Sequence, residues 1–171
     1  STTVLTAMMA LGGLAAMGSS ARWLERGHDA IRLAALGALA GCTGFLGVIF
    51  ASPLSSGIWF QAGALLIGLG EGLFAIGTLA YAMQLPGRDQ SSGLVLGAWG
   101  AVFATCEGAA LLLSGGAKDW LSHLAASGAM GVALSSPTVP YSLVYHLEIL
   151  LLFGNMIAIV PLVAPAGARR Y

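Results

Sequence analysis

Five long apolar stretches alternate with short polar connections along the 171-residue chain. The stretches lie at about 2–21, 33–51, 59–83, 93–114 and 141–164. A helix needs about 20 apolar residues to cross the hydrocarbon core of a bilayer, and each stretch approaches or exceeds that length. The pattern predicts an all-α integral membrane protein in which residues 1–171 form one membrane domain with five transmembrane helices.

The longest connection, 115–140, should lie on the outer side of the membrane. Its KDWLSHLAA segment is typical of a short amphipathic helix lying along the interface, with Trp120 at headgroup depth. Pro137 and Pro140 then precede the last span, which we expect to begin at Tyr141.

Composition agrees with lipid as the main solvent of the side chains. Hydrophobic residues make up 57% of the chain and charged residues 8%, whereas a soluble domain carries about 25% charged residues. The formal net charge is zero and no basic patch indicates nucleic acid. Cys42 and Cys106 both fall in apolar stretches, which favours packing roles over a disulfide or a metal pair.

We find no hydrolase, kinase or dinucleotide motif, and expect no catalytic residues and no enzymatic activity.

Basic residues fall almost entirely on alternate connections, and this predicts an orientation. They are Arg22, Arg26 and Arg32 after the first stretch, Arg88 after the third, and Arg169 and Arg170 after the fifth, against Lys118 alone on the other side. Because basic residues near span ends are retained in the cytoplasm, the C-terminus should be cytoplasmic.

Glycines one helical turn apart occur in three of the predicted spans. The pairs are Gly37 and Gly41, Gly68 and Gly72, and Gly93 and Gly97. Such spacing lets helix backbones approach closely in lipid, so these spans should pack tightly against neighbours. The alternative is that glycine is simply common in membrane helices.

Three acidic residues, Glu71, Glu107 and Glu148, lie within or near spans. A charged side chain at the bilayer centre costs about 2.5–3.5 kcal/mol or more, so each should face the bundle interior and find a partner. They indicate either a proton-linked cavity or ligand site, or neutral acids that hydrogen-bond between helices. Glu148 lies near the outer end of its span, where water can reach it.

His146 lies on a different side of the last span from Glu148. It shares a helix face with Leu150, Phe153 and Ile157. An imidazole on such an apolar surface can serve as axial ligand to the magnesium of a chlorophyll-type macrocycle. The alternative is an interfacial histidine that reaches lipid headgroups or a neighbouring carbonyl. We expect no metal other than such a pigment magnesium.

Several strings resemble the C-terminal half of one family. They are STTVLTAMMALGGLAAMG, LLIGLGEGLFAIGTLAYAM, SGLVLGAWGAVFATCEG and YSLVYHLEILLLFGNMIAIVPLV. They resemble the PucC/LhaA family, light-harvesting-complex assembly proteins of the major facilitator superfamily from purple phototrophs. The resemblance implies that the five spans correspond to spans eight to twelve of a major-facilitator-type fold. The start at Ser1 inside an apolar stretch and the odd number of spans also lead us to expect a fragment of a longer protein.

The resemblance implies a non-enzymatic assembly factor in the bacterial cytoplasmic (intracytoplasmic photosynthetic) membrane. Such a factor would bind or deliver bacteriochlorophyll, with carotenoid as a further candidate. Its partners would be lipid, antenna polypeptides, the reaction centre, and a missing N-terminal half or other membrane subunits.

The YHLE string matches a characteristic stretch of the family's last span, which adds weight to pigment contact at His146 and Glu148. Glu71 and Glu107 depart from the family pattern, so no role is carried over to them.

Two alternative functions of the protein stay open. One is a stable structural subunit of a reaction-centre and antenna supercomplex. The other is a proton-coupled secondary transporter that uses Glu71 and Glu107.

Protease accessibility tests the predicted orientation. In sealed vesicles with the cytoplasmic face inside, Arg26 and Arg170 should both be protected from trypsin, because both are predicted to be cytoplasmic. Vesicles of the opposite orientation should expose both sites. Protection of one site with cleavage of the other in the same vesicles would contradict the topology.

Overall fold

The computed structural model describes residues 2–84, 92–127, 131 and 139–163. Across these residues the secondary structure is helical, without strands. The helices are α1 (Thr2–Glu25), α2 (Ala30–Ala51), α3 (Gly57–Met83), α4 (Ser92–Ala126), α5 (Val139–Ile159) and the short 3-10 helix η2 (Val160–Leu162). All five α-helices are long and apolar enough to cross a membrane, which confirms the predicted all-α membrane class. The major-facilitator arrangement stays a prediction.

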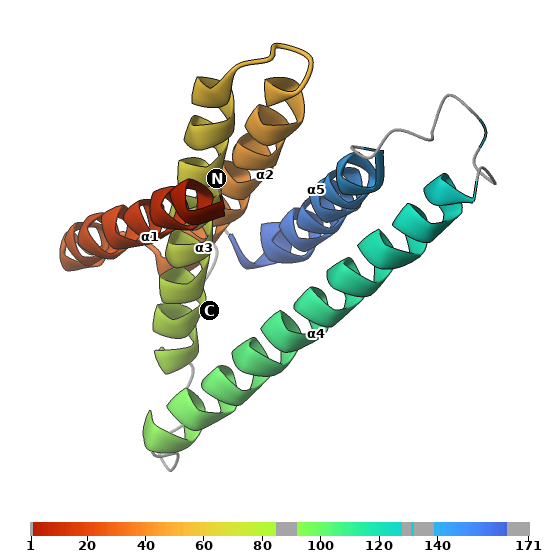
Figure 1. Cartoon of the computed structure of the whole chain (residues 1–171). Helices are drawn as coiled ribbons and strands as arrows, with labels where there is room; N and C mark the ends of the chain where they lie inside the picture. The colour runs from red at the N-terminus through yellow and green to blue at the C-terminus, as the bar shows by residue number, and fades with distance from the viewer. Residues whose placement is uncertain (1, 85–91, 128–130, 132–138, 164–171) are drawn as a thin grey trace.

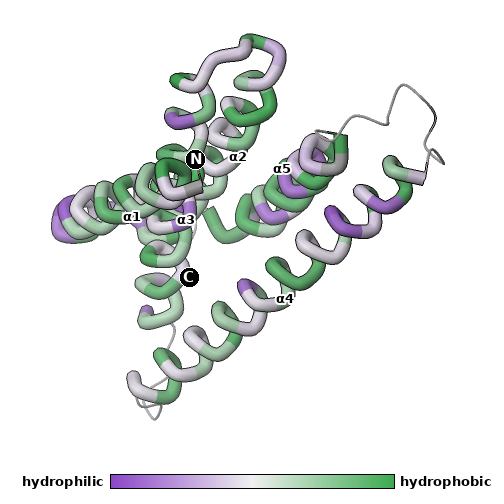
Figure 2. Tube along the Cα trace, viewed as in Figure 1, coloured by the Kyte–Doolittle hydropathy of each residue, from purple (hydrophilic) through white to green (hydrophobic). Residues whose placement is uncertain are grey.

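Helices α1, α2 and α3 form the most closely packed group. Helix α2 runs antiparallel to α3, and α1 lies across α3 (Figure 1). Helix α5 packs on α2, while α4 diverges from the group along much of its length. Hydrophilic residues gather at the C-terminal end of α1 and in the last turns of α4 (Figure 2). The polar ends and apolar middles match helices that contact lipid.

Small residues at seven-residue intervals bring α2 and α3 into backbone contact. We call this set the glycine seam: Ala30, Gly37 and Gly44 on α2 face Gly77, Gly70 and Gly63 on α3. A Cβ added at Gly70 would lie 2.6 Å from the Gly37 carbonyl oxygen, and one at Gly63 would lie 2.7 Å from that of Gly44. Seven residues are about two helical turns, so the small residues stay on one face and the helices remain close along the seam.

Helix α1 uses a second set of glycines on α3. Gly68 lies against the backbone of Met9, and a Cβ at Gly72 would lie 2.6 Å from the Ala16 Cβ. At about 100° per residue, Gly68 and Gly72 lie on roughly the opposite face of α3 from the seam glycines. Helix α3 is therefore the central element, with α1 on one side and α2 on the other.

The three predicted glycine pairs have different surroundings. Gly37 lies against α3, and Gly68 and Gly72 lie against α1. The backbone of Gly41 lies near Gly70 of α3, but a Cβ at Gly41 would meet Leu152 of α5. A Cβ at Gly93 or Gly97 on α4 would meet nothing within 4 Å, so close packing at this pair stays a prediction. The physical reason for the open space is that Trp99 turns one face of α4 toward α3, and Gly97 lies about 200° around the helix from it, on a face that no described residue covers.

Helix α4 is longer than the sequence analysis expected. It runs unbroken for 35 residues to Ala126, so the KDWLSHLAA segment continues α4 instead of forming a separate interfacial helix within a 115–140 loop. At 1.5 Å per residue, α4 is about 50 Å long and exceeds the ~30 Å hydrocarbon core. No proline interrupts 92–126, and the helix therefore continues past the apolar stretch.

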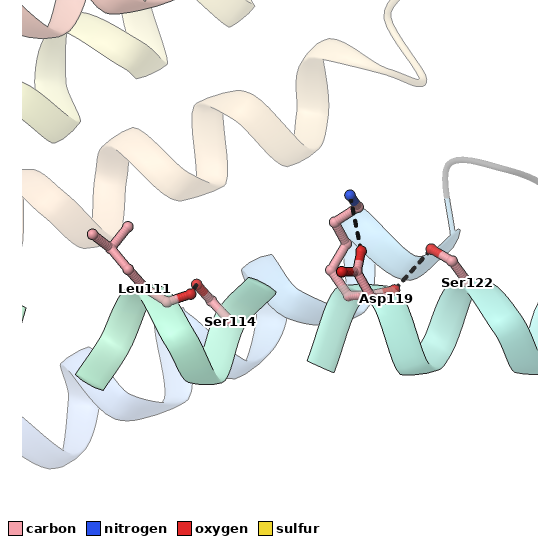
Figure 3. A network of polar contacts seen from close by, with 5 residues as sticks. Leu111, Ser114, Asp119 and Ser122 are labelled. Carbon is pink, nitrogen blue, oxygen red and sulfur yellow. Dashed lines mark hydrogen bonds and ion pairs between the residues drawn. The ribbon is translucent and has the colours of Figure 1, made fainter. Parts of the chain in front are cut away.

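Polar contacts accompany the extended part of α4 (Figure 3). The Lys118 Nζ lies 3.3 Å from the Asp119 Oδ1, and the Ser122 hydroxyl donates to the Lys118 carbonyl at 2.7 Å. The Lys118 ammonium also lies 5.4 Å from the Tyr141 ring centroid, so the end of α4 meets the start of α5. These contacts suit a helix end that leaves the hydrocarbon.

Substitution in the glycine seam should destabilise the protein. A Cβ in Gly70→Ala meets backbone atoms of α2 that cannot move without separating the helices, and overpacking of this kind costs about 1–3 kcal/mol. We expect a lower melting temperature in detergent, measured by size-exclusion chromatography after heating. Gly97→Ala is the matched control, because its Cβ points into open space and should leave the melting temperature unchanged or slightly raised. Equal melting of the two variants would contradict the role of the seam.

Candidate functional site

His146 lies near the start of α5, and its ring is exposed. The Nδ1 atom lies 2.6 Å from the carbonyl oxygen of Ser142, one turn earlier in the helix. A carbonyl oxygen only accepts, so in the neutral ring Nδ1 carries the hydrogen and Nε2 presents a lone pair. This is the tautomer that a metal ligated through Nε2 requires.

The face of α5 around His146 is apolar and uncovered by the described residues. It includes Leu150, Phe153 and Ile157, which are 70%, 55% and 73% exposed. A Cβ at Gly154 would meet nothing within 4 Å, so no described residue covers this position either. The flat apolar ring of a chlorophyll-type pigment suits this face, and the His146 Nε2 suits its magnesium.

Glu148 does not share this face. The two side chains are about 200° apart around the helix, and Glu148 is half-buried whereas His146 is exposed. The Glu148 carboxylate interacts electrostatically with Tyr145, whose ring centroid lies 6.1 Å from that of Phe45 on α2. The structure therefore does not bring the two predicted pigment ligands together.

Glu71 and Glu107 lie on α3 and α4 and interact electrostatically with each other. The Trp99 Nε1 donates to the Thr78 hydroxyl at 3.3 Å and ties the same two helices together. The helices are antiparallel there, so Glu107, eight residues after Trp99, comes level with Glu71, seven residues before Thr78. Both acids are exposed instead of facing a bundle interior, because α4 packs against α3 only along one side.

Two grooves were not predicted from the sequence. One, of about 710 Å³, lies beside the α2–α3 turn and the start of α5, with Ser56, Phe60, Tyr141 and Tyr145 in its lining. The other, of about 500 Å³, lies beside the α1–α2 connection, with Trp23 and Arg32 in its lining. Both are formed by side chains from separate helices, and hydropathy along the chain carries no signal for them.

Metal-binding potential within the protein itself is limited. Among the described residues, no group of three or more His, Cys, Asp or Glu side chains is placed to hold a metal ion. Cys42 is buried, Cys106 is exposed, and both are free thiols. Single-ligand coordination, in which a macrocycle supplies the other metal ligands, is the arrangement that His146 offers.

The five apolar helices and their glycine-mediated contacts define an integral membrane protein. The chain belongs to the PUCC protein family, whose family model matches residues 1–167. This finding confirms the resemblance identified from the sequence strings.

Individual relatives support the family assignment. An uncharacterized protein in the puhA–bchM intergenic region of Rhodobacter capsulatus is 44% identical over 166 residues, covering 97% of this chain and 34% of the relative. Protein PucC of Cereibacter sphaeroides is 42% identical over 170 residues, covering 99% of this chain and 36% of the relative. The chain thus spans about a third of the length of these relatives. No solved structure matches the chain.

Proposed function

We propose that this chain is part of a non-enzymatic assembly factor for bacterial light-harvesting complexes, and that it holds bacteriochlorophyll beside antenna polypeptides. Family membership relates the chain to photosynthetic complexes, since the relatives include proteins named PucC. The proposed location is the photosynthetic cytoplasmic membrane, with the C-terminus in the cytoplasm. Binding and delivery of pigment are the finer part of the proposal.

The arrangement of His146 is the observation that carries pigment binding. Metal-ligating histidines commonly donate their second ring N–H to a backbone carbonyl, which fixes the tautomer and the ring orientation. The 2.6 Å contact between the His146 Nδ1 and the Ser142 carbonyl oxygen supplies this support. The His146 Nε2 would hold the magnesium of a bacteriochlorophyll, and the pigment would supply the absorption of light.

Desolvation supports the same assignment. The surface of α5 around His146 is apolar and exposed, which is the character of a lipid-facing surface. An acceptor atom left without a partner in an apolar medium costs about 1–3 kcal/mol. Ligation to magnesium offsets this cost, and the apolar side chains beside His146 exclude water from the bond. A carotenoid needs no such ligand and can lie against the same apolar face.

An absorption spectrum of the intact protein, purified in mild detergent, tests pigment binding. We expect a near-infrared band that co-purifies with the protein or develops when bacteriochlorophyll is added. His146→Phe should abolish most of this band, because the phenyl ring preserves the size of the side chain but lacks the nitrogen ligand. His123→Phe, which changes another exposed histidine, should retain it.

Two outcomes would overturn pigment binding at this site. The first is the absence of any pigment band both before and after bacteriochlorophyll is added. The second is an unchanged band in His146→Phe. Size-exclusion profiles of the variants distinguish loss of the ligand from loss of the fold.

The placement of Glu71 and Glu107 at the same level of two neighbouring helices favours a second candidate, proton-coupled transport. Two carboxyl groups that interact within membrane helices can share or exchange a proton, which is the usual role of such groups in transporters. Transporter sites form between the two repeats of a fold. This candidate therefore requires a second repeat to complete the pathway.

Proton flux in proteoliposomes tests the transport candidate. If the pair carries protons, the intact protein should dissipate an imposed pH gradient, followed with a trapped pH-sensitive dye. Glu71→Gln should reduce the flux to the level of empty liposomes, because an amide cannot take up the proton. Glu25→Gln, at the exposed end of α1, is the control and should match the unmodified protein. Equal fluxes in both variants would exclude this pathway.

A further inference from the structure

The groove beside the α1–α2 connection has a rigid polar end. The Trp23 ring lies 4.6 Å from the His28 ring, measured between centroids, and the Trp23 Nε1 donates to the Asp29 carbonyl at 3.4 Å. The Asp29 carboxylate accepts from the Ile31 amide at 3.1 Å and caps the start of α2. These contacts give the connection a defined shape and place Arg32 in the first turn of α2.

Arg32 offers an unneutralised positive charge to this groove. Its side chain is exposed, and within the described part of the chain it has no ion pair. The nearest acid in sequence, Asp29, also lines the groove, but its carboxylate accepts from the Ile31 amide and forms no ion pair with Arg32. A guanidinium group presents five N–H donors in a planar fork, and this geometry suits a phosphate group.

An apolar trough continues from Arg32 along α2. Leu36 and Leu39 follow at four and seven residues, so the three side chains share one helix face over about 10 Å. Both leucines line the groove and remain partly exposed, at 42% and 47%. Met156 on α5 forms the facing wall. The groove therefore has a cationic end and an apolar body.

We propose that this groove binds an anionic phospholipid, with the phosphate at Arg32 and one acyl chain along Leu36 and Leu39. Charge complementarity favours an anionic lipid, because the Asp29 carboxylate accepts from the α2 N-terminus while Arg32 has no ion pair among the described residues. Basic pockets between transmembrane helices are typical sites for such headgroups, and Trp23 is of the type found at headgroup depth. The site does not depend on pigment binding at His146.

Native mass spectrometry of the intact, delipidated protein tests the proposal. Phosphatidylglycerol and phosphatidylcholine with identical acyl chains are titrated separately, and the bound fraction is read from the mass shift. We expect phosphatidylglycerol to bind more tightly, and Arg32→Gln to weaken its binding about tenfold, as loss of a charge-assisted hydrogen bond implies. Arg26→Gln removes the same charge from the adjoining α1–α2 connection, outside the groove lining, and should weaken binding less than about twofold.

Each alternative outcome separates a different explanation. Equal weakening by Arg32→Gln and Arg26→Gln would show diffuse charge attraction and overturn the groove as the site. Equal binding of the two lipids would overturn the headgroup preference. Glycerophosphoglycerol, which has no acyl chains, should not bind. If it bound as tightly as phosphatidylglycerol, the groove would be a phosphate site and the acyl-chain part of the proposal would be wrong. Loss of a near-infrared band in Arg32→Gln would assign the groove to pigment instead.

The comparison of the two lipids on the unmodified protein needs no variant, so the test stands even if Arg32→Gln folds poorly. Arg32→Lys supplies a further check, because it keeps the charge but loses the planar fork. We expect it to retain the preference for phosphatidylglycerol at an affinity between those of the unmodified protein and Arg32→Gln.

Discussion

Helices in lipid cannot rely on the hydrophobic effect to associate, because the surrounding chains are as apolar as the side chains. Close backbone packing must replace it, and the glycine seam between α2 and α3 provides that packing at three levels separated by two intervals of seven residues. The second set of glycines on α3 receives α1 in the same way. The position of α3 between two backbone contacts determines where the other helices can lie.

The candidate pigment surface depends on this arrangement through α2. Helix α5 packs antiparallel on α2, with Phe45 beside Tyr145 at one end and Ile31 beside Ile159 at the other. This packing buries one side of α5 and turns His146 and the neighbouring leucines outward. A change that separated α2 from α3 would therefore also disturb the orientation of the imidazole, although His146 lies on α5 and outside the glycine seam.

The sequence predicted the number and approximate bounds of the helices well, because hydropathy reports directly on lipid exposure. It missed the length of α4, since a polar stretch around Lys118 marks the edge of the membrane and not the end of a helix. The spacing of Gly93 and Gly97 could not show whether a partner helix was present. The seam itself was detectable only by comparing seven-residue intervals in two helices at once, and the tautomer of His146 required the position of the Ser142 carbonyl.

The two ligand sites proposed for this chain lie on different surfaces of the α2–α5 pair. His146 faces outward from the first half of α5, whereas Met156 and Arg32 meet in the groove at the far end of the same pair. A phospholipid in that groove would contact both helices and so reinforce the packing that orients the imidazole. The proposed lipid groove and the exposed His146 face therefore both depend on how α5 packs against α2.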